Sequence, residues 1–168
     1  MITLVLGGAR SGKSAVAERL VSRLPEPVTY LATLSAASVA ADAELSARVQ
    51  AHRTRRPAGW LTVEAGADLP ATVIATSGTL LVDALGPWVA GSPTFAADAA
   101  LLCRALRGRA GDAVVVSEEV GLGVHPSTAA GRSFRDALGE VNQAVAAVAD
   151  EVLLVVAGRT LRLDPESR

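Results

Sequence analysis

The sequence is poor in aromatic residues and in cysteine, although half of its 168 residues are hydrophobic. Aromatic residues make up only 3% of the chain, so the core must be built from Ala, Val and Leu, which suits buried parallel strands beneath closely packed helices. The single cysteine, Cys103, falls in a predicted helix over 96–107, where we expect it to be a packing residue. A lone cysteine excludes an intramolecular disulfide and favours a reducing, cytoplasmic location.

Long uncharged segments are missing as well. No stretch of about twenty residues lacks charge, and the N-terminus has neither a basic segment nor an apolar run long enough for a signal peptide. We therefore expect neither export nor a membrane span. The net charge is −1, with 16 Lys and Arg against 17 Asp and Glu, so no general positive field favours nucleic acid or an anionic membrane as a partner. Local basic clusters can still hold phosphates.

Lysine occurs only once, as Lys13, and the other strong cations are all arginine. It lies in the pattern G-x-x-x-x-G-K-[ST] of a P-loop, whose backbone N–H groups surround nucleotide phosphates and whose lysine reaches the β- and γ-phosphates. A planar guanidinium does not fit there. The hydroxyl of Ser14 would bind magnesium. The predicted nucleotide-binding residues of this loop are Gly7, Gly8, Ala9, Arg10, Ser11, Gly12, Lys13 and Ser14.

The flanks of this loop agree with the motif, because a predicted strand over 2–6 precedes it and a predicted helix over 14–24 follows it. The alternative is a chance glycine turn.

Along the rest of the chain, short apolar runs alternate with helical segments, which predicts βαβ units and a mostly parallel sheet. The predicted strands are 2–6, 28–32, 61–63, 79–83, 113–117 and 151–157.

The last of these runs turns at Gly158 into residues 160–163, so we expect an antiparallel edge strand at the C-terminal end. The small residues of segment 34–41 indicate a mobile surface loop. There is no internal repeat and no linker. The sequence therefore predicts one α/β domain over residues 1–168.

A carboxylate ends the apolar strand Thr79–Asp83. This is the pattern of a Walker B strand, in which Asp83 would act on magnesium directly or through water. The alternative is an aspartate that caps the next helix. The P-loop upstream favours the magnesium interpretation.

A basic segment surrounds the first of the two histidines, His52. On a helix that starts near Asp42 and ends before Pro57, Arg48 and His52 lie four residues apart and share a face. The like charge of nearby guanidiniums would favour the neutral imidazole, which can act as a base or a nucleophile beside bound phosphates. The alternative is a solvated basic helix face. The guanidiniums in question belong to Arg48, Arg53, Arg55 and Arg56.

Two further segments carry candidate binding residues. Glu118 and the residue after it follow a predicted parallel strand, at the sheet edge where such folds bind ligands, and the glycines beyond them indicate a shaped loop. We assign no catalytic role to His125 in this loop. On the long helix predicted from 132 to 150, Arg132 and Arg135 share a face with Gly139 and could reach a phosphate or a neighbouring subunit. A solvated helix face is the alternative.

Together these residues resemble the adenosylcobinamide kinase / adenosylcobinamide-phosphate guanylyltransferase family. The resemblance is nearly full length, from Leu4 to Gly158. The family more often has Asn at the position of Glu118. The segments that carry the resemblance, in the family's order, are GGARSGKS, YLAT, RVQAHRTRRPAGWLTVE, LLVDALGPW, VSEEVGLGVHP and GRSFRDALGEVNQAVAAVADEVLLVVAG.

The resemblance implies a RecA-like P-loop NTPase fold, assembled as a homotrimer, and two reactions. ATP or GTP would phosphorylate adenosylcobinamide at the P-loop. His52 would then attack the α-phosphate of GTP and hold GMP as a phosphoramidate, which passes to adenosylcobinamide phosphate to give adenosylcobinamide-GDP. The implied catalytic residues are Lys13 and His52, and the implied magnesium ligands are Ser14 and Asp83. The implied nucleotide contacts beyond the P-loop are Ala32, Thr33, Leu34, Arg53, Thr54, Arg55, Arg56, Glu64 and Asp83.

Two other functions fit parts of the sequence. In a different small-molecule P-loop kinase, His52 would only bind phosphate, and the protein would acquire no GMP. A RecA-like regulatory or nucleic-acid-binding ATPase would hydrolyse nucleotide in response to nucleic acid, but the near-neutral charge and the few aromatic residues argue against it.

Overall fold

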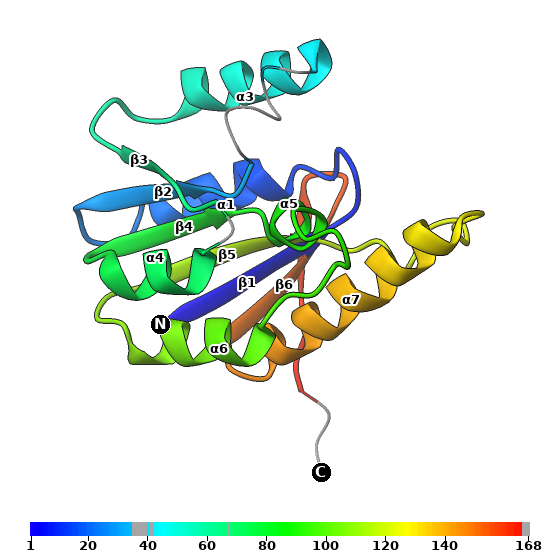
Figure 1. The fold of residues 1–168 in the computed structure, drawn as a ribbon. Coiled ribbons are helices and arrows are strands. Elements are labelled where there is room, and N and C mark those ends of the chain that lie inside the picture. Colours follow the sequence, from blue (N-terminus) through cyan, green and yellow to red (C-terminus); the bar gives the residue numbers. More distant parts are fainter. Residues whose placement is uncertain (35–39, 41, 67, 166–168) are drawn as a thin grey trace.

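A single sheet forms the centre of the structure (Figure 1). The computed structural model describes residues 1–34, 40, 42–66 and 68–165, and the predicted surface loop over 34–41 lies mostly outside them. Within the described residues the strands are β1 (Ile2–Gly7), β2 (Val28–Ala32), β3 (Leu61–Glu64), β4 (Thr79–Asp83), β5 (Ala113–Glu118), β6 (Glu151–Val156) and β7 (Arg159–Arg162). Their order is β3-β2-β4-β5-β1-β6-β7. Neighbouring strands are parallel except β6 and β7, so the predicted antiparallel C-terminal edge strand is confirmed.

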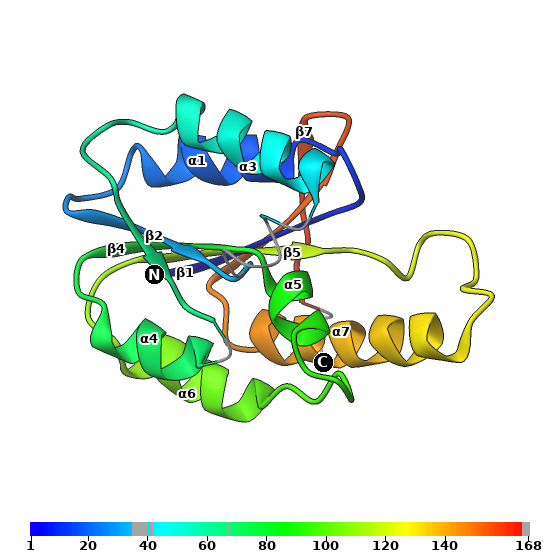
Figure 2. The ribbon, with the colours of Figure 1, turned by 45° about the horizontal axis from the view of Figure 1, so that its top comes forward.

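Helices cover both faces of this sheet, as the alternation of apolar runs predicts. The helices that the structure describes are α1 (Lys13–Val21), α3 (Ala43–Arg55), α4 (Leu69–Ala75), α5 (Leu85–Ala90), α6 (Ala99–Gly108) and α7 (Ala129–Ala146). Helices α1 and α3 lie over one face, and the other four lie over the opposite face (Figure 2). Among the described helices, none combines the length and the apolar character that crossing a membrane requires.

The two faces of the sheet build two separate hydrophobic clusters. Alternation along β1 directs Leu4 and Leu6 toward the side of α4, α6 and α7, and Val5 toward the side of α1. Each buried Leu or Val contributes about 1.5–3 kcal/mol relative to an exposed one. Leu, Val and Ala dominate both clusters, and Cys103 is buried in the larger one, as expected from the composition.

The carboxyl ends of the parallel strands meet along one edge. Gly7 of β1 pairs with Glu118 of β5, and Ala32 of β2 pairs with both Asp83 of β4 and Glu64 of β3. The sheet therefore brings the ends of these five strands to the same edge. A ligand that bridges these strand ends can contact all of them.

Several helix ends differ from the predictions, and at two helix starts an unrecognised capping residue is the reason. Helix α6 starts at Ala99 rather than Ala96, since the side chain of Asp98 accepts a hydrogen bond from Leu101 N and caps the helix. Helix α7 starts at Ala129, before Arg132, because Thr128 caps it in the same way. It ends at 146 rather than 150, and α1 ends at 21 rather than 24.

Candidate active site

The predicted P-loop connects β1 to α1. Gly12, the residue before the helix, has φ 92°, a conformation that glycine adopts without strain. The amide of Ser11 donates to the carbonyl of Gly8 at 3.3 Å, which closes the loop on itself. The amide of Gly158, in the turn between β6 and β7, donates to the carbonyl of Ser11 at 2.8 Å. The C-terminal hairpin therefore supports the loop from outside, a role that its sequence did not reveal.

The side chain of Lys13 lies over this loop. Its Nζ is 3.4 Å from the carbonyl oxygen of Gly8 and 3.7 Å from Oε1 of Glu118. Only 12% of the lysine side chain is exposed. The ammonium therefore lies at the carboxyl edge of the sheet, between the P-loop and the end of β5.

Glu118, at the end of β5, is fixed next to Lys13 by contacts from α5 and α7. Its Oε2 accepts a hydrogen bond from Gly86 N at 3.0 Å, and a Cβ at position 86 would collide with this carboxylate. Burial raises the pKa of the Glu118 carboxyl, while Lys13 opposes the shift and Asp83 adds to it. The side chain of Asn142 donates to the backbone carbonyl of Glu118 at 3.1 Å, so α7 also fixes this strand end.

Asp83 lies directly beside the P-loop. Its Oδ1 accepts a hydrogen bond from Ser14 Oγ at 3.3 Å, and its Oδ2 accepts one from the hydroxyl of Tyr30 at 3.2 Å. The alternative that Asp83 caps the next helix is wrong, because the residue before α5 is Ala84 and no side chain caps that helix. Two oxygen donors of the kind that magnesium prefers therefore lie side by side.

Tyr30 is the neighbour of Asp83 that the sequence reasoning missed. Burial, followed by the negative charge of Asp83, raises the pKa of the Tyr30 hydroxyl far above its usual value. It therefore stays protonated and acts as a hydrogen-bond donor. The guanidinium of Arg56 covers the tyrosine ring at 3.7 Å from its centroid.

His52 faces the P-loop from α3. Its Nδ1 lies 3.5 Å from Oδ2 of Asp83 and 3.9 Å from Oε1 of Glu18. The predicted surroundings of arginines are thus incomplete, because two carboxylates approach the imidazole and the sequence reasoning named neither contact. The side chain of Arg48, predicted to share this face, lies outside the described part of the structure.

Arg55, at the end of α3, and Arg56, just after it, contact groups around His52 rather than its imidazole ring. Arg55 binds Glu18 through Nε at 3.3 Å and Nη2 at 3.2 Å. Arg56 donates through Nε to the carbonyl of His52 at 3.3 Å. Both arginines therefore have partners within the protein, although Arg55 remains exposed and the alternative of a solvated helix face stays open for it. Arg53 is exposed and lines, with Arg56 and Trp60, a cavity of about 270 Å³.

The remaining predicted contacts divide into edge residues and backbone supports. Ala32 and Glu64 end their strands at the site edge, and Leu34 is half-buried nearby. The buried hydroxyl of Thr33 donates to the carbonyl of Ala84 and accepts from its amide, so it fixes the backbone after Asp83. The hydroxyl of Thr54 donates to the carbonyl of Gln50 within α3.

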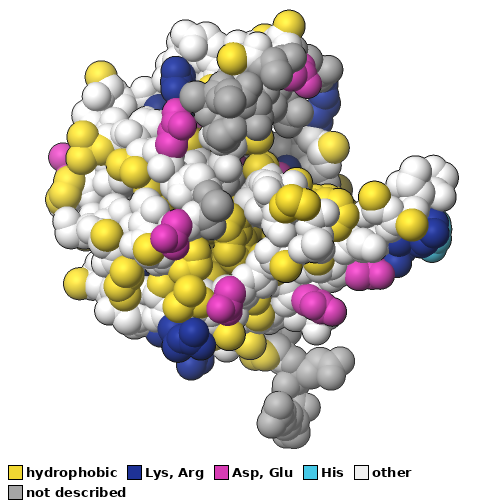
Figure 3. All heavy atoms as spheres, viewed as in Figure 1, with side chains coloured by type: hydrophobic (Ala, Val, Ile, Leu, Met, Phe, Trp, Pro, Cys, Tyr) yellow, Lys and Arg dark blue, Asp and Glu magenta, His cyan; other side chains and the backbone are white. Residues whose placement is uncertain are grey.

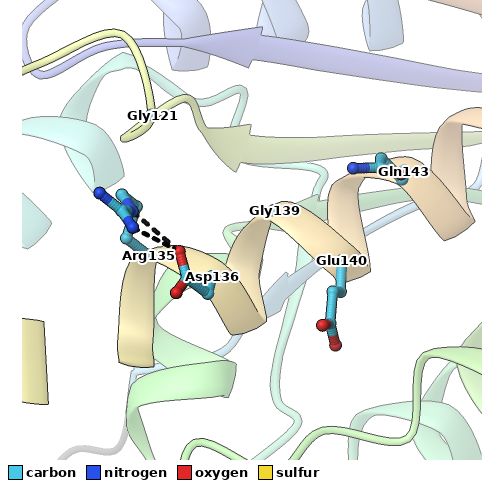
Figure 4. A pocket seen from close by; sticks show the side chains of 6 residues that line it. All are labelled: Gly121, Arg135, Asp136, Gly139, Glu140 and Gln143. Carbon is cyan, nitrogen blue, oxygen red and sulfur yellow. Dashed lines mark hydrogen bonds and ion pairs between the residues drawn. The ribbon is translucent and has the colours of Figure 1, made fainter. Parts of the chain in front are cut away.

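The N-terminal half of α7 and the loop before it extend beyond the sheet (Figures 1 and 2). A shallow cavity of about 390 Å³ lies there, lined by Gly121, Arg135, Asp136, Gly139, Glu140 and Gln143 (Figure 4). Arg135 pairs with Asp136, its neighbour on the helix, at 2.8 Å. Arg132 donates to the carbonyls of Pro126 and Ser127. Both predicted phosphate-binding arginines thus have local partners.

One face of the molecule carries exposed apolar side chains. On the face that carries α4 and α6, hydrophobic side chains gather and Lys and Arg occur only in isolated places (Figure 3). Exposed apolar residues of these helices include Ile74 and Leu101.

Comparison with known proteins gives a consistent result. The chain is 39% identical to the bifunctional adenosylcobalamin biosynthesis protein CobU of Salmonella typhimurium, over 94% of this chain and 97% of that protein. It is 37% identical to the protein CobP of the same description from Pseudomonas aeruginosa, over 99% of both chains. Among solved structures, the flagellar accessory protein FlaH from Methanocaldococcus jannaschii aligns over 95% of this chain and 74% of its own, at 14% identity and a TM-score of 0.46, a likeness too weak to carry an inference. Residues 3–163 match the family described as cobinamide kinase / cobinamide phosphate guanyltransferase, and the chain belongs to this family.

Proposed function

We propose that this protein phosphorylates adenosylcobinamide with ATP or GTP and then transfers GMP from GTP to the product, which gives adenosylcobinamide-GDP. One observation carries the proposal beyond family membership: His52, the residue proposed to hold GMP, lies 3.5 Å from Asp83, which itself contacts Ser14 of the P-loop. The alternative is a kinase in which His52 only binds phosphate, and such a protein would acquire no GMP. The proximity also supports a single site for both reactions.

In the kinase step, the P-loop amides and Lys13 bind the β- and γ-phosphates of the nucleotide. The hydroxyl oxygen of the aminopropanol group of the substrate bonds to the γ-phosphorus and its proton passes to solvent. The bond from that phosphorus to the bridging oxygen breaks, and the nucleoside diphosphate leaves with the electron pair. Ser14 and Asp83 would hold magnesium, because their oxygen atoms suit that ion and lie together at this edge. When bound, the ion supplies positive charge to the phosphate oxygens.

In the guanylyl step, His52 provides a nitrogen lone pair. The nitrogen bonds to the α-phosphorus of GTP, the bond to the bridging oxygen breaks, and pyrophosphate leaves with its electron pair. An oxygen of adenosylcobinamide phosphate then bonds to the same phosphorus, and the imidazole leaves. The covalent intermediate divides one difficult transfer into two easier ones.

We also infer a homotrimer in the cytoplasm. The family resemblance implies the homotrimer, the lone Cys103 favours the cytoplasm, and one structural feature supports an assembly. Leu122 and Val124, in the loop that extends with α7 beyond the sheet, are 79% and 96% exposed. Apolar side chains at such a projecting position are suited to contact another subunit. Light scattering on the purified protein measures the mass; a monomer at micromolar concentration contradicts the inference.

The decisive experiment is to incubate the protein with adenosylcobinamide, GTP and magnesium and to identify the corrinoid products by mass. We expect adenosylcobinamide phosphate first and adenosylcobinamide-GDP second. Phosphate product without any GDP product would indicate a simple kinase. The absence of both would contradict the proposed function.

A further inference from the structure

The imidazole of His52 has two possible acceptors for a proton on Nδ1. Oδ2 of Asp83 lies 3.5 Å away and Oε1 of Glu18 lies 3.9 Å away. The carboxylate of Glu18 is only 12% exposed and that of Asp83 only 9%. Two sheltered carboxylates next to one ring nitrogen mark this nitrogen as the donor side of the ring, because the partner of one ring nitrogen fixes the tautomer.

The two carboxylates are not equivalent. Asp83 already accepts from Ser14 and from Tyr30, and it is the proposed magnesium ligand. An oxygen that binds a cation is a poorer acceptor for a neighbouring N–H, so Asp83 cannot serve His52 equally well while magnesium and nucleotide are bound.

Glu18 is not a proposed metal ligand, and among its described contacts no hydroxyl donates to its carboxylate. Arg55 binds both of its oxygens, Oε2 at 3.3 Å and Oε1 at 3.2 Å, and so fixes the carboxylate from the same helix that carries His52. Arg55 follows His52 by three residues on α3, so the helix presents both side chains to α1 together. A shift of about 1 Å would bring Nδ1 of His52 within hydrogen-bond distance of Glu18.

We infer that Glu18 is a positioning residue for guanylyl transfer: it accepts the Nδ1–H of His52 and thereby makes Nε2 the atom that carries GMP. This inference rests on the proposed function. In the transfer, the lone pair of Nε2 forms the bond to the α-phosphorus, and the bond from that phosphorus to the bridging oxygen breaks. Pyrophosphate takes the electron pair. The proton on Nδ1 stays between the ring and Glu18, which stabilises the positive charge that develops on the imidazole.

The experiment compares wild type with Glu18→Ala, Glu18→Gln and the control Glu26→Gln, an exposed carboxylate on the loop between α1 and β2. Two quantities are measured with α-labelled GTP: the rate of covalent labelling at saturating GTP, and the ring nitrogen that carries phosphorus, read from ³¹P and ¹⁵N NMR of the labelled protein. Phosphorylation of adenosylcobinamide by ATP reports whether each variant is folded and retains its P-loop.

We expect wild type and Glu26→Gln to carry GMP on Nε2. Glu18→Ala should label about 10- to 100-fold more slowly, the cost typical of losing the partner that orients a histidine. It should also lose the exclusive Nε2 position while its phosphorylation of adenosylcobinamide continues. Glu18→Gln, which keeps an oxygen acceptor, should recover part of the rate and the Nε2 position. A merely structural glutamate would not change which nitrogen is labelled.

Three results would overturn the inference. Label on Nδ1 of wild type, or labelling of Glu18→Ala on Nε2 at the wild-type rate, removes the role of Glu18 while leaving the proposed function intact. Wild type that takes up no GMP contradicts the proposed function itself, and the role of Glu18 with it.

Discussion

Ser14 and Asp83 are joined by a hydrogen bond of 3.3 Å, although 68 residues separate them in the sequence. The contact exists because β4 and β1 belong to the same parallel sheet and end at the same edge, with β5 between them. The P-loop hydroxyl and the strand-end carboxylate thus approach each other before any ligand enters. The magnesium role that we propose for this pair leads to the prediction for Asp83 below.

Replacing Lys13 by Ala or Arg should abolish the kinase reaction and leave the fold intact. The ammonium is the only lysine in the chain and lies over the loop, 3.4 Å from the carbonyl of Gly8. Losing a cation that stabilises the transferred phosphoryl group costs on the order of several kcal/mol in the transition state. Turnover with ATP and circular dichroism measure the two quantities. Arg19→Ala, at an exposed position of α1, serves as the control. Wild-type turnover in Lys13→Ala would contradict the P-loop assignment.

Replacing Asp83 by Asn should reduce magnesium-dependent turnover much more than it reduces stability. Ser14 and Tyr30 donate to different oxygens of Asp83, so the amide keeps an acceptor for one of these two hydrogen bonds and loses the negative charge that attracts a cation. Kinase rates are measured across a magnesium titration. The control Asp98→Asn alters the carboxylate that caps α6 and should show the magnesium dependence of wild type. If Asp83→Asn keeps the wild-type magnesium dependence, the carboxylate does not act on the metal.

Glu118→Gln should stabilise the fold at neutral pH but not in acid. Burial raises the pKa of the Glu118 carboxyl, so the folded state binds this proton more tightly than the unfolded chain does. The contribution of protonated Glu118 to the unfolding free energy of the wild type is therefore complete below the ordinary glutamate pKa of about 4.3. This contribution is lost as the pH rises through the raised pKa of the folded state. Glutamine cannot ionise and can still accept the hydrogen bond from Gly86.

Urea unfolding of wild type and Glu118→Gln at several pH values tests the predicted direction of this pH dependence. The difference in unfolding free energy should favour Glu118→Gln near pH 7 and shrink toward about pH 4. A constant difference over this range would mean that the carboxylate of Glu118 is as well solvated in the folded protein as in the unfolded chain. The ion pair with Lys13 acts against the predicted effect, because it stabilises the charged form.

The sequence predicted those parts of the site that lie within one short segment. The P-loop and the carboxylate of Asp83 could be recognised because their residue types and flanking strands are fixed by local geometry. Glu18 and Tyr30 could not, since their contacts with His52 and Asp83 depend on how α1 packs near α3 and on β2 lying next to β4. The same limit explains why the arginines were assigned to the imidazole: Arg55 and Arg56 turn to Glu18 and to the ring of Tyr30 instead.

The two proposed reactions should separate at His52. Phosphoryl transfer to a hydroxyl needs no covalent enzyme intermediate, whereas the proposed guanylyl transfer depends on one. His52→Ala should therefore keep the kinase reaction and lose adenosylcobinamide-GDP formation. With α-labelled GTP, wild type should acquire label that survives denaturation, is released by acid and resists alkali, as a phosphoramidate does. His52→Ala should acquire none.

The chain provides a matched control for this experiment in His125, which is exposed on the loop before α7 and is the second of the two histidines. His125→Ala should be labelled like wild type. The decisive arm supplies adenosylcobinamide phosphate and GTP to His52→Ala, so that the kinase step is no longer needed. Formation of adenosylcobinamide-GDP at the wild-type rate would show that GMP passes directly from GTP to the substrate. In that case the position of His52 beside Asp83 and Glu18 would serve only to hold α3 over the P-loop.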